Sequence, residues 1–219
     1  MKEHIKQHLL ERCKRGAPCI PFDSAALNVS DIAELVQILN EHKANFDKTL
    51  QIRLSQNGLG NNAFDSLLTL DLPYGFTLDL SRNNIELAAL EHLAAADPKS
   101  SSLLSVDLSD NAFSQYTLNG KTYTNVGLTK AVSLIKSSRI PISVESDNLF
   151  KPHLPEIKAA QAEMKKQLTE EAVQTDANSE GSDSTALTTP MTFFAQEPAK
   201  PTKQQSAPGQ SPTNHSDSD

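Results

Sequence analysis

Two histidines and two cysteines near the N-terminus are the residues whose types and spacing most directly suggest chemistry. His4 and His8 lie four positions apart, which would place them on one face of a helix, and Cys13 and Cys19 follow. Imidazole and thiolate groups are the usual protein ligands of zinc. The intervals between these residues match no common zinc-binding pattern, so we interpret both histidines as neutral residues on a charged helix and expect no metal or cofactor.

The rest of the chain carries no motif that is typical of an enzyme. It has no G-x-S-x-G nucleophile motif and no glycine-rich phosphate-binding loop. A formal net charge of −7 and a pI near 5.4 argue against nucleic-acid binding, which needs a basic surface. We therefore expect a protein that is not an enzyme and has no nucleic-acid partner.

Hydropathy and cysteine content bear on the compartment. No segment approaches the ~20 consecutive apolar residues needed to cross a membrane, and residues 1–10 lack the apolar core of a secretory signal. Two cysteines are too few for a disulfide scaffold. We therefore expect a cytoplasmic protein with reduced thiols and no membrane partner.

The elements that would position functional residues are indicated by a pattern of apolar residues and asparagine that returns along the chain. Asn57, Asn83 and Asn111 are 26 and then 28 residues apart, as in the units of a repeat protein. In each copy, two apolar residues at spacing two predict a strand, the asparagine can pair with backbone groups of the following turn, and the last apolar residue is expected in the core. The copies are Ile52-x-Leu54-x-x-Asn57-x-Leu59, Leu78-x-Leu80-x-x-Asn83-x-Ile85, Val106-x-Leu108-x-x-Asn111-x-Phe113 and a degenerate Ile142-x-Val144-x-x-Asp147-x-Leu149.

Amphipathic segments before and between these turns predict helices. The clearest, Asp31–Asn40, places Ile32, Val36 and Leu39 on one face, and Ser30 is its expected N-cap. The other expected helical segments are Phe64–Leu68, Leu87–Leu93 and Leu128–Ile135.

The three complete copies resemble leucine-rich repeats of the ribonuclease-inhibitor type, whose signature is L-x-x-L-x-L-x-x-N-x-L. Thr49 and Gly75 stand where that signature has a leucine, and Ile20-x-Phe22 suggests an atypical first unit. The resemblance implies an α/β solenoid of about four or five units, with a parallel sheet on its concave side. It also implies a function in protein–protein binding.

The resemblance covers residues 20–150 and leaves a segment at each end. Ile5, Leu9 and Leu10 could cover the apolar end of the stack, as solenoids require. The last residues, rich in Ser, Thr, Pro and Gln, cannot bury enough apolar surface to offset the entropy cost of ordering them. We predict a capping helix at 1–19, repeats at 20–150, an amphipathic helix at 151–173 and a disordered tail at 174–219.

The third unit contains an insertion, predicted at 114–125, that reads as a β-hairpin. Asn119-Gly120 is the preferred centre of a two-residue type I′ turn, since both positions need positive φ. With that turn, Tyr116 would pair with Tyr123. We expect either a projection that helps hold a partner or a hairpin that only covers core.

Strand geometry predicts which side chains face the concave surface, because they alternate with the buried ones. Asp79, Asp107 and Glu145 outnumber Arg53 there, so we expect a mildly acidic face that attracts a protein partner with a basic patch. A merely solvated sheet face is the alternative. The predicted partner-binding residues, in a protein expected to be a monomer, are Gln51, Arg53, Asp79, Arg82, Asp107, Asp110, Tyr116, Tyr123 and Glu145.

Two alternatives come from other members of the repeat family. A leucine-rich-repeat GTPase activator would offer an arginine to a nucleotide site, and Arg53 and Arg82 are the arginines near this face. A cytoskeletal role is implied by the resemblance to the repeat domain of tropomodulins, in which a small solenoid ends in an amphipathic helix, here at 155–173.

The order of a few irregular repeats followed by a polar tail also resembles the effector proteins that some intracellular bacteria inject into host cells. That resemblance implies translocation without a classical signal peptide, with the tail as an export signal or a site of modification.

Overall fold

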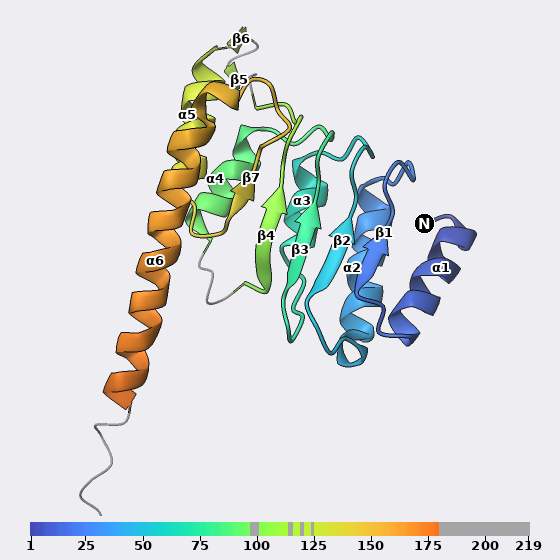
Figure 1. Cartoon of the computed structure of the whole chain (residues 1–219). Coiled ribbons are helices and arrows are strands. Elements are labelled where there is room, and N and C mark those ends of the chain that lie inside the picture. The colour runs from blue at the N-terminus through green and yellow to red at the C-terminus, as the bar shows by residue number, and fades with distance from the viewer. Residues whose placement is uncertain (97–100, 114–115, 119–120, 124, 180–219) are drawn as a thin grey trace, which may run out of the picture.

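The molecule is built on one sheet of five parallel strands in the order β1-β2-β3-β4-β7 (Figure 1). The computed structural model describes residues 1–96, 101–113, 116–118, 121–123 and 125–179. The strands, one for each expected repeat unit and one for the atypical first unit, are β1 (Cys19–Pro21), β2 (Leu50–Arg53), β3 (Phe76–Asp79), β4 (Leu103–Asp107) and β7 (Ile142–Ser143).

Four helices cover one face of this sheet, as Figure 1 shows. Each follows a strand and lies within a few residues of a predicted helical segment. They are α2 (Val29–Glu41), α3 (Asn61–Leu67), α4 (Leu87–Ala95) and α5 (Asn125–Ser137). Alternating strands and helices around a parallel sheet confirm the predicted leucine-rich-repeat architecture.

The core follows the strand register. Ile20, Ile52, Leu78, Val106 and Ile142 form one row across the five strands, and each is at most 3% exposed. Because side chains alternate along a strand, the residues between these core positions face the other side of the sheet, away from the helices.

The repeated asparagines bind neighbouring units together. The Asn83 amide Nδ2 donates to the carbonyl of Leu80 in its own unit and to that of Leu54 in the preceding unit, at 3.0 Å each. Asn111 repeats the arrangement with Leu108 and Leu80, at 2.9 Å each. The asparagine therefore satisfies turn carbonyls that would otherwise be buried without a donor.

The predicted N-cap of the second helix was wrong. Asn28, not Ser30, caps α2: its Oδ1 accepts from the Asp31 N–H at 3.1 Å, and Asp31 Oδ2 accepts from the Asn28 N–H at 2.9 Å. This reciprocal pair is a capping box, which explains why the helix begins at Val29.

The predicted core position in the last unit was also wrong. Leu149 is 48% exposed, and the neighbouring Phe150, 1% exposed, fills the core with its ring edge-on to Phe113. The turn differs because Asp147 Oδ1 accepts from the Leu149 N–H at 2.8 Å, and a short 3₁₀ helix, η2 (Lys151–His153), follows Phe150. An aspartate cannot donate as the asparagine amide does, so this turn takes another path.

A helix stands at each end of the sheet: α1 (Glu3–Lys14) and α6 (Leu154–Ser179) (Figure 1). Arg12 of α1 donates to the Cys19 carbonyl of one edge strand at 3.0 Å, and Gln161 of α6 donates to the Ile142 carbonyl of the other at 2.9 Å. These bonds, with the apolar contacts of the two helices, satisfy and cover sheet edges that would otherwise be open to pairing.

The C-terminal part of α6 passes beyond the expected helix end at residue 173 and reaches Ser179. Residues 180–219, most of the predicted disordered tail, lie outside the described part of the chain. Within the described residues, no helix combines the length and apolar character needed to cross a bilayer.

The inserted hairpin consists of β5 (Tyr116–Leu118) and β6 (Lys121–Tyr123), which pair antiparallel. Tyr116 pairs with Tyr123 and Leu118 with Lys121, which is the predicted register. In Figure 1 the hairpin lies beside α5, away from the middle of the sheet.

Candidate protein-binding surface

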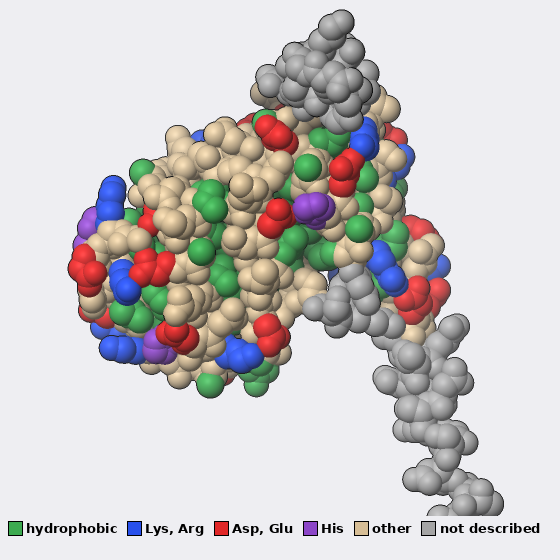
Figure 2. Space-filling view, turned by 180° about the vertical axis from the view of Figure 1, so that it is seen from behind, with side chains coloured by type: hydrophobic (Ala, Val, Ile, Leu, Met, Phe, Trp, Pro, Cys, Tyr) green, Lys and Arg blue, Asp and Glu red, His purple; other side chains and the backbone are tan. Residues whose placement is uncertain are grey.

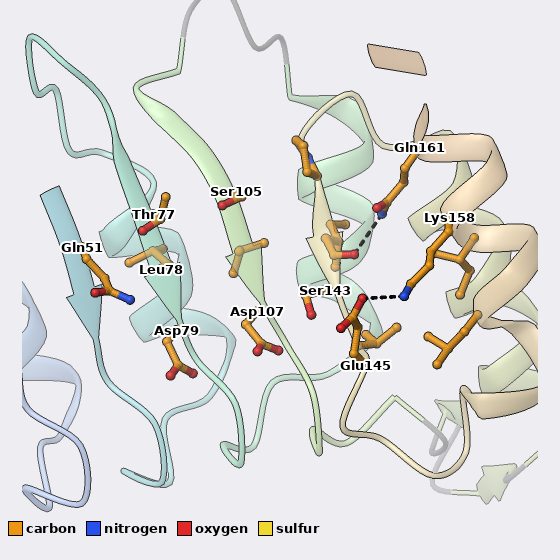
Figure 3. A pocket seen from close by; sticks show the side chains of 16 residues that line it. Gln51, Thr77, Leu78, Asp79, Ser105, Asp107, Ser143, Glu145, Lys158 and Gln161 are labelled. Carbon is orange, nitrogen blue, oxygen red and sulfur yellow. Dashed lines mark hydrogen bonds and ion pairs between the residues drawn. The ribbon is translucent and has the colours of Figure 1, made fainter. Parts of the chain in front are cut away.

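The concave face of the sheet carries polar columns in the predicted positions. Gln51, Thr77 and Ser105 form one row across adjacent strands. The next row along the strands consists of Arg53, Asp79, Asp107 and Ser143. Five of the nine predicted binding residues therefore lie on one face: Gln51, Asp79, Asp107 and Glu145, which Figure 3 labels, and Arg53, which the register pairs with Asp79.

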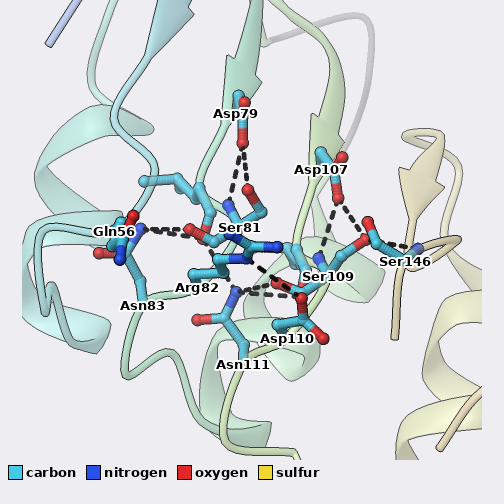
Figure 4. A network of polar contacts seen from close by, with 12 residues as sticks. Gln56, Asp79, Ser81, Arg82, Asn83, Asp107, Ser109, Asp110, Asn111 and Ser146 are labelled. Atoms are coloured by element: carbon cyan, nitrogen blue, oxygen red, sulfur yellow. Dashed lines mark hydrogen bonds and ion pairs between the residues drawn. The ribbon is translucent and has the colours of Figure 1, made fainter. Parts of the chain in front are cut away.

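Asp79 and Asp107 are each held by a serine two residues later. Asp79 Oδ1 accepts from Ser81 N at 3.1 Å and Ser81 Oγ at 2.7 Å, and Asp107 Oδ1 accepts from Ser109 at 2.9 and 2.7 Å (Figure 4). The second carboxylate oxygen of each has no donor among the described residues. The repeated Asp-x-Ser pattern therefore fixes two carboxylates side by side with one acceptor oxygen each left for a ligand.

Arg53 occupies the same row but is neutralised from the preceding unit. Asp23 Oδ2 lies 2.5 Å from Arg53 Nη2, while Asp23 Oδ1 accepts from Ser55 Oγ at 2.7 Å. Asp23 thus holds the serine of a strand that has no aspartate of its own. Asp23 was not among the predicted binding residues, although the register that pairs Pro21 with Arg53 places Asp23 opposite Ser55.

Glu145, at the other side of the face, is also paired. Its Oε1 lies 2.8 Å from Lys158 Nζ of α6, and both side chains are well exposed. With the Arg53 pair included, four carboxylates and two cations leave this face a formal charge of −2. Asp79 and Asp107 carry the uncompensated negative charge. The acidic region is therefore smaller than the predicted one, which also included Glu145.

Arg82 and Asp110 lie in the turns that follow β3 and β4 and form an exposed ion pair at 3.5 Å (Figure 4). Both have positive φ, as does Gln56 in the preceding turn. The three residues occupy equivalent positions in successive repeats, so the repeated turn accounts for their shared backbone conformation. Arg53 and Arg82, the two arginines considered for a GTPase activator, each form an ion pair with an aspartate of the same chain.

The helix α6 turns the polar face into a groove. Leu154, Ile157, Lys158 and Gln161 of α6 form a wall beside β7, and the sheet residues of the two rows form the floor (Figure 3). The cavity between them has a volume of about 380 Å³. These wall residues were not predicted as part of the site, because their approach depends on how α6 packs against the edge strand.

The opposite, helix-covered face has a different character. Figure 2 shows acidic, basic and hydrophobic side chains intermixed over that side. No large area of a single charge faces outward among the side chains that this view colours. The two adjacent aspartates of the groove are therefore the more distinctive electrostatic feature.

Two of the four residues first considered for metal binding, His8 and Cys13, pack against other parts of the fold. The His8 ring lies edge-on to Phe22 with ring centroids 5.8 Å apart, and Cys13 is fully buried. Burial raises the pKa of the Cys13 thiol to about 11, which disfavours the thiolate that metals need. Within the described residues, no three His, Cys, Asp or Glu side chains cluster as metal ligands would.

Tyr116 and Tyr123 lie opposite one another on the hairpin of β5 and β6, which Figure 1 shows beside α5. The backbone register places these two residues, while their side chains lie outside the described part of the structure. Their predicted part in partner binding stays a prediction.

Comparisons with known proteins give fold likenesses only. No family model matches the sequence, and no characterised protein sequence matches it. A solved structure described as actin-binding site 2 of leiomodin-1 is 11% identical with a TM-score of 0.48, over 78% of this chain and 96% of that one. The C-terminal domain of tropomodulin from Caenorhabditis elegans is 13% identical with a TM-score of 0.46, over 77% and 98%.

Proposed function

We propose that this protein is a non-enzymatic binding module that holds a basic segment of a protein partner in the groove between its concave sheet and α6. The observation that carries the proposal is the pair Asp79 and Asp107. Their side chains lie on adjacent strands about 5 Å apart, and serines orient them. A lysine or arginine of a partner can donate hydrogen bonds to the free oxygens of both carboxylates in a charge-assisted contact.

The groove supports this reading because binding energy concentrates in places that exclude water. Its floor supplies hydrogen-bonding groups such as Gln51 and Ser105, and its wall supplies the partly buried, apolar Leu154. An ion pair that a partner covers there is screened less than the exposed pair of Arg82 and Asp110.

The test uses charge reversal with a matched control. A double variant, Asp79→Lys with Asp107→Lys, reverses the groove charge, while Asp65→Lys with Glu91→Lys makes the same change in net charge on the helix-covered side. Full-length protein, the two variants and a chain ending at Ser179 serve as baits in eukaryotic and bacterial lysates. We expect a partner that the full-length protein captures to be lost from the groove variant and retained by the helix-side variant and by the chain ending at Ser179.

Two results would count against the proposal. A partner that both charge-reversed variants retain would show that the groove is not the binding surface. A partner lost only when residues 180–219 are removed would assign binding to that segment instead.

A second candidate is binding to a cytoskeletal protein, and the length of α6 favours it. This helix has 26 residues and continues well past the sheet in Figure 1. Actin, named in the description of the leiomodin-1 structure, is a direct probe. Co-sedimentation with filaments, lost on substitution of exposed α6 residues such as Lys165→Glu and Lys166→Glu, would support this function. Sedimentation at background level would exclude it for actin.

We further propose that the protein acts in the cytoplasm, and in that of a host cell if it is a translocated bacterial effector. The two cysteines are unpaired thiols, which is compatible with a reducing compartment. A fusion of the full chain to a reporter that signals only in host cytosol would test translocation. Absence of signal from an infected cell, with the reporter expressed, would contradict it.

A further inference from the structure

One interior strand of the solenoid has a β-bulge at the edge of the proposed groove. β3 and β4 pair Phe76 with Leu103 and Thr77 with Ser105, so Leu104 is an extra residue with no partner across the ladder. Bulges redirect side chains and are frequent next to functional sites. Here the redirected side chain is a leucine.

The bulge places Leu104 on the concave side. Leu103 and Val106 are buried in the core, whereas Leu104 and Ser105 between them are not, and a Cβ on Gly75 would lie 2.8 Å from Leu104 Cγ. The leucine side chain therefore lies over the glycine, whose φ of +70° a side chain would strain. The glycine that replaces the usual repeat leucine makes room for an outward one.

Leu104 remains 47% exposed in this position, one of four large hydrophobic residues that are exposed among those described. An outward leucine in a column of serines and aspartates gains little from folding, since apolar surface left in water contributes no burial. Contact with Gly75 explains part of its placement. The exposed part offers an apolar contact to a partner at this position.

The distance from this leucine to the acidic pair is fixed by strand geometry. Leu104 precedes Asp107 by three residues on β4, which corresponds to about 10 Å along the strand. The bulge brings both onto one face, although residues three apart normally point to opposite sides. Asp79 lies beside Asp107 on the neighbouring strand.

We propose that the groove and the adjoining Leu104 recognise a partner segment through two anchors, an apolar side chain that covers Leu104 and a lysine or arginine held between Asp79 and Asp107. This inference rests on the proposed function and adds to it the chemistry and spacing of the bound segment. The charge of the acidic pair selects the cation, and the spacing of Leu104 and Asp107 along β4 sets the separation of the anchors at about 10 Å.

The experiment selects ligands for the full-length protein from a phage-displayed library of random dodecapeptides. We expect enriched peptides to combine one large apolar residue and one Lys or Arg at a recurring separation. Synthetic representatives should lose about tenfold or more in affinity on Leu104→Ser, and similarly on Asp79→Asn with Asp107→Asn. Leu149→Ser is the matched control, because Leu149 is 48% exposed but lies between β7 and η2 rather than on the strand that carries Asp107.

The reciprocal change, serine for the apolar residue of the peptide, tests the same contact on unaltered protein if the Leu104 variant folds poorly. Peptides that lose affinity with the aspartate variant but not with either change at the leucine contact would overturn this inference and leave the proposed function standing. Peptides indifferent to the aspartates would overturn both. No enrichment above a bait-free surface would overturn the inference.

Discussion

Asn57 and Asn83 connect two successive turns of the solenoid directly, because Asn83 Oδ1 accepts from the Asn57 backbone N–H at 3.0 Å. The same oxygen accepts from Leu59 N at 2.9 Å, while the Asn83 amide donates to carbonyls of both units. One side chain that is 5% exposed thus satisfies backbone groups from two repeats.

Asn83→Ala should therefore destabilise the fold strongly. It leaves buried backbone donors and acceptors unsatisfied, at about 1–3 kcal/mol for each group, so we expect a loss of about 3 kcal/mol or more in the free energy of unfolding. Urea denaturation followed by circular dichroism measures it. Asn84→Ala is the control, because that neighbouring asparagine is exposed and makes one longer bond, 3.3 Å, to Gly58. Equal losses for the two variants would contradict the role assigned to the asparagine ladder.

The capping box of α2 predicts a difference between two residues that are close in sequence. Asn28→Ala removes the cap and should cost about 1 kcal/mol in the free energy of unfolding. Ser30→Ala removes only a hydroxyl that donates to Asn28 Oδ1 at 2.7 Å, and should cost less than about 0.5 kcal/mol. Thermal unfolding of both variants measures the two losses in stability. A larger loss for Ser30→Ala than for Asn28→Ala would show that Ser30 is the N-cap.

The two thiols should react at very different rates. Burial raises the pKa of Cys13 to about 11, whereas Cys19 is partly exposed. At pH 8 only roughly a thousandth of Cys13 would be thiolate, so alkylation by iodoacetamide should be slower than at Cys19 by a factor on the order of a hundred. Mass spectrometry of time points gives both rates. In guanidinium the two cysteines should react at the same rate. Equal rates in the native protein would mean that α1 opens readily and exposes Cys13.

Contacts between α5 and α6 predict a pH-dependent contribution to stability. Glu156 Oε2 lies 3.0 Å from Lys136 Nζ and its Oε1 lies 2.8 Å from His153 Nδ1, and these two partners lower the pKa of Glu156 below its usual 4.5. A carboxylate whose pKa is lower in the folded than in the unfolded state stabilises the fold at pH values above its unfolded-state pKa. This stabilisation is lost as the pH falls through the folded-state pKa. Glu156→Gln should thus lower the Tm at pH 7.

Below pH 4.5 the difference in Tm between that variant and the unaltered protein should shrink towards zero, because the carboxylate becomes protonated in both folded and unfolded states. High salt should reduce the difference at pH 7 as well, since the pair is exposed. A Tm difference that is constant across this pH range would assign the effect to packing rather than to charge.

The sequence by itself determined the repeat architecture. Strand positions, the helices between them, the asparagine turns and the alternation that puts Gln51, Asp79 and Asp107 on one face are all local and periodic. Each copy of the pattern encodes its own unit, and successive units stack with the same register. The hairpin register also followed from local turn chemistry.

Only the tertiary structure decided how that face is completed. Asp23 neutralises Arg53 across 30 residues of sequence, and Lys158 of α6 neutralises Glu145. The uncompensated negative charge of the face therefore lies on Asp79 and Asp107. The bulge at Leu104 came from a mismatch between neighbouring strands, and the exchange of Leu149 for Phe150 from a turn that lacks the asparagine amide. These features depend on contacts between units and on how the terminal helix packs, which a repeating pattern within one unit does not encode.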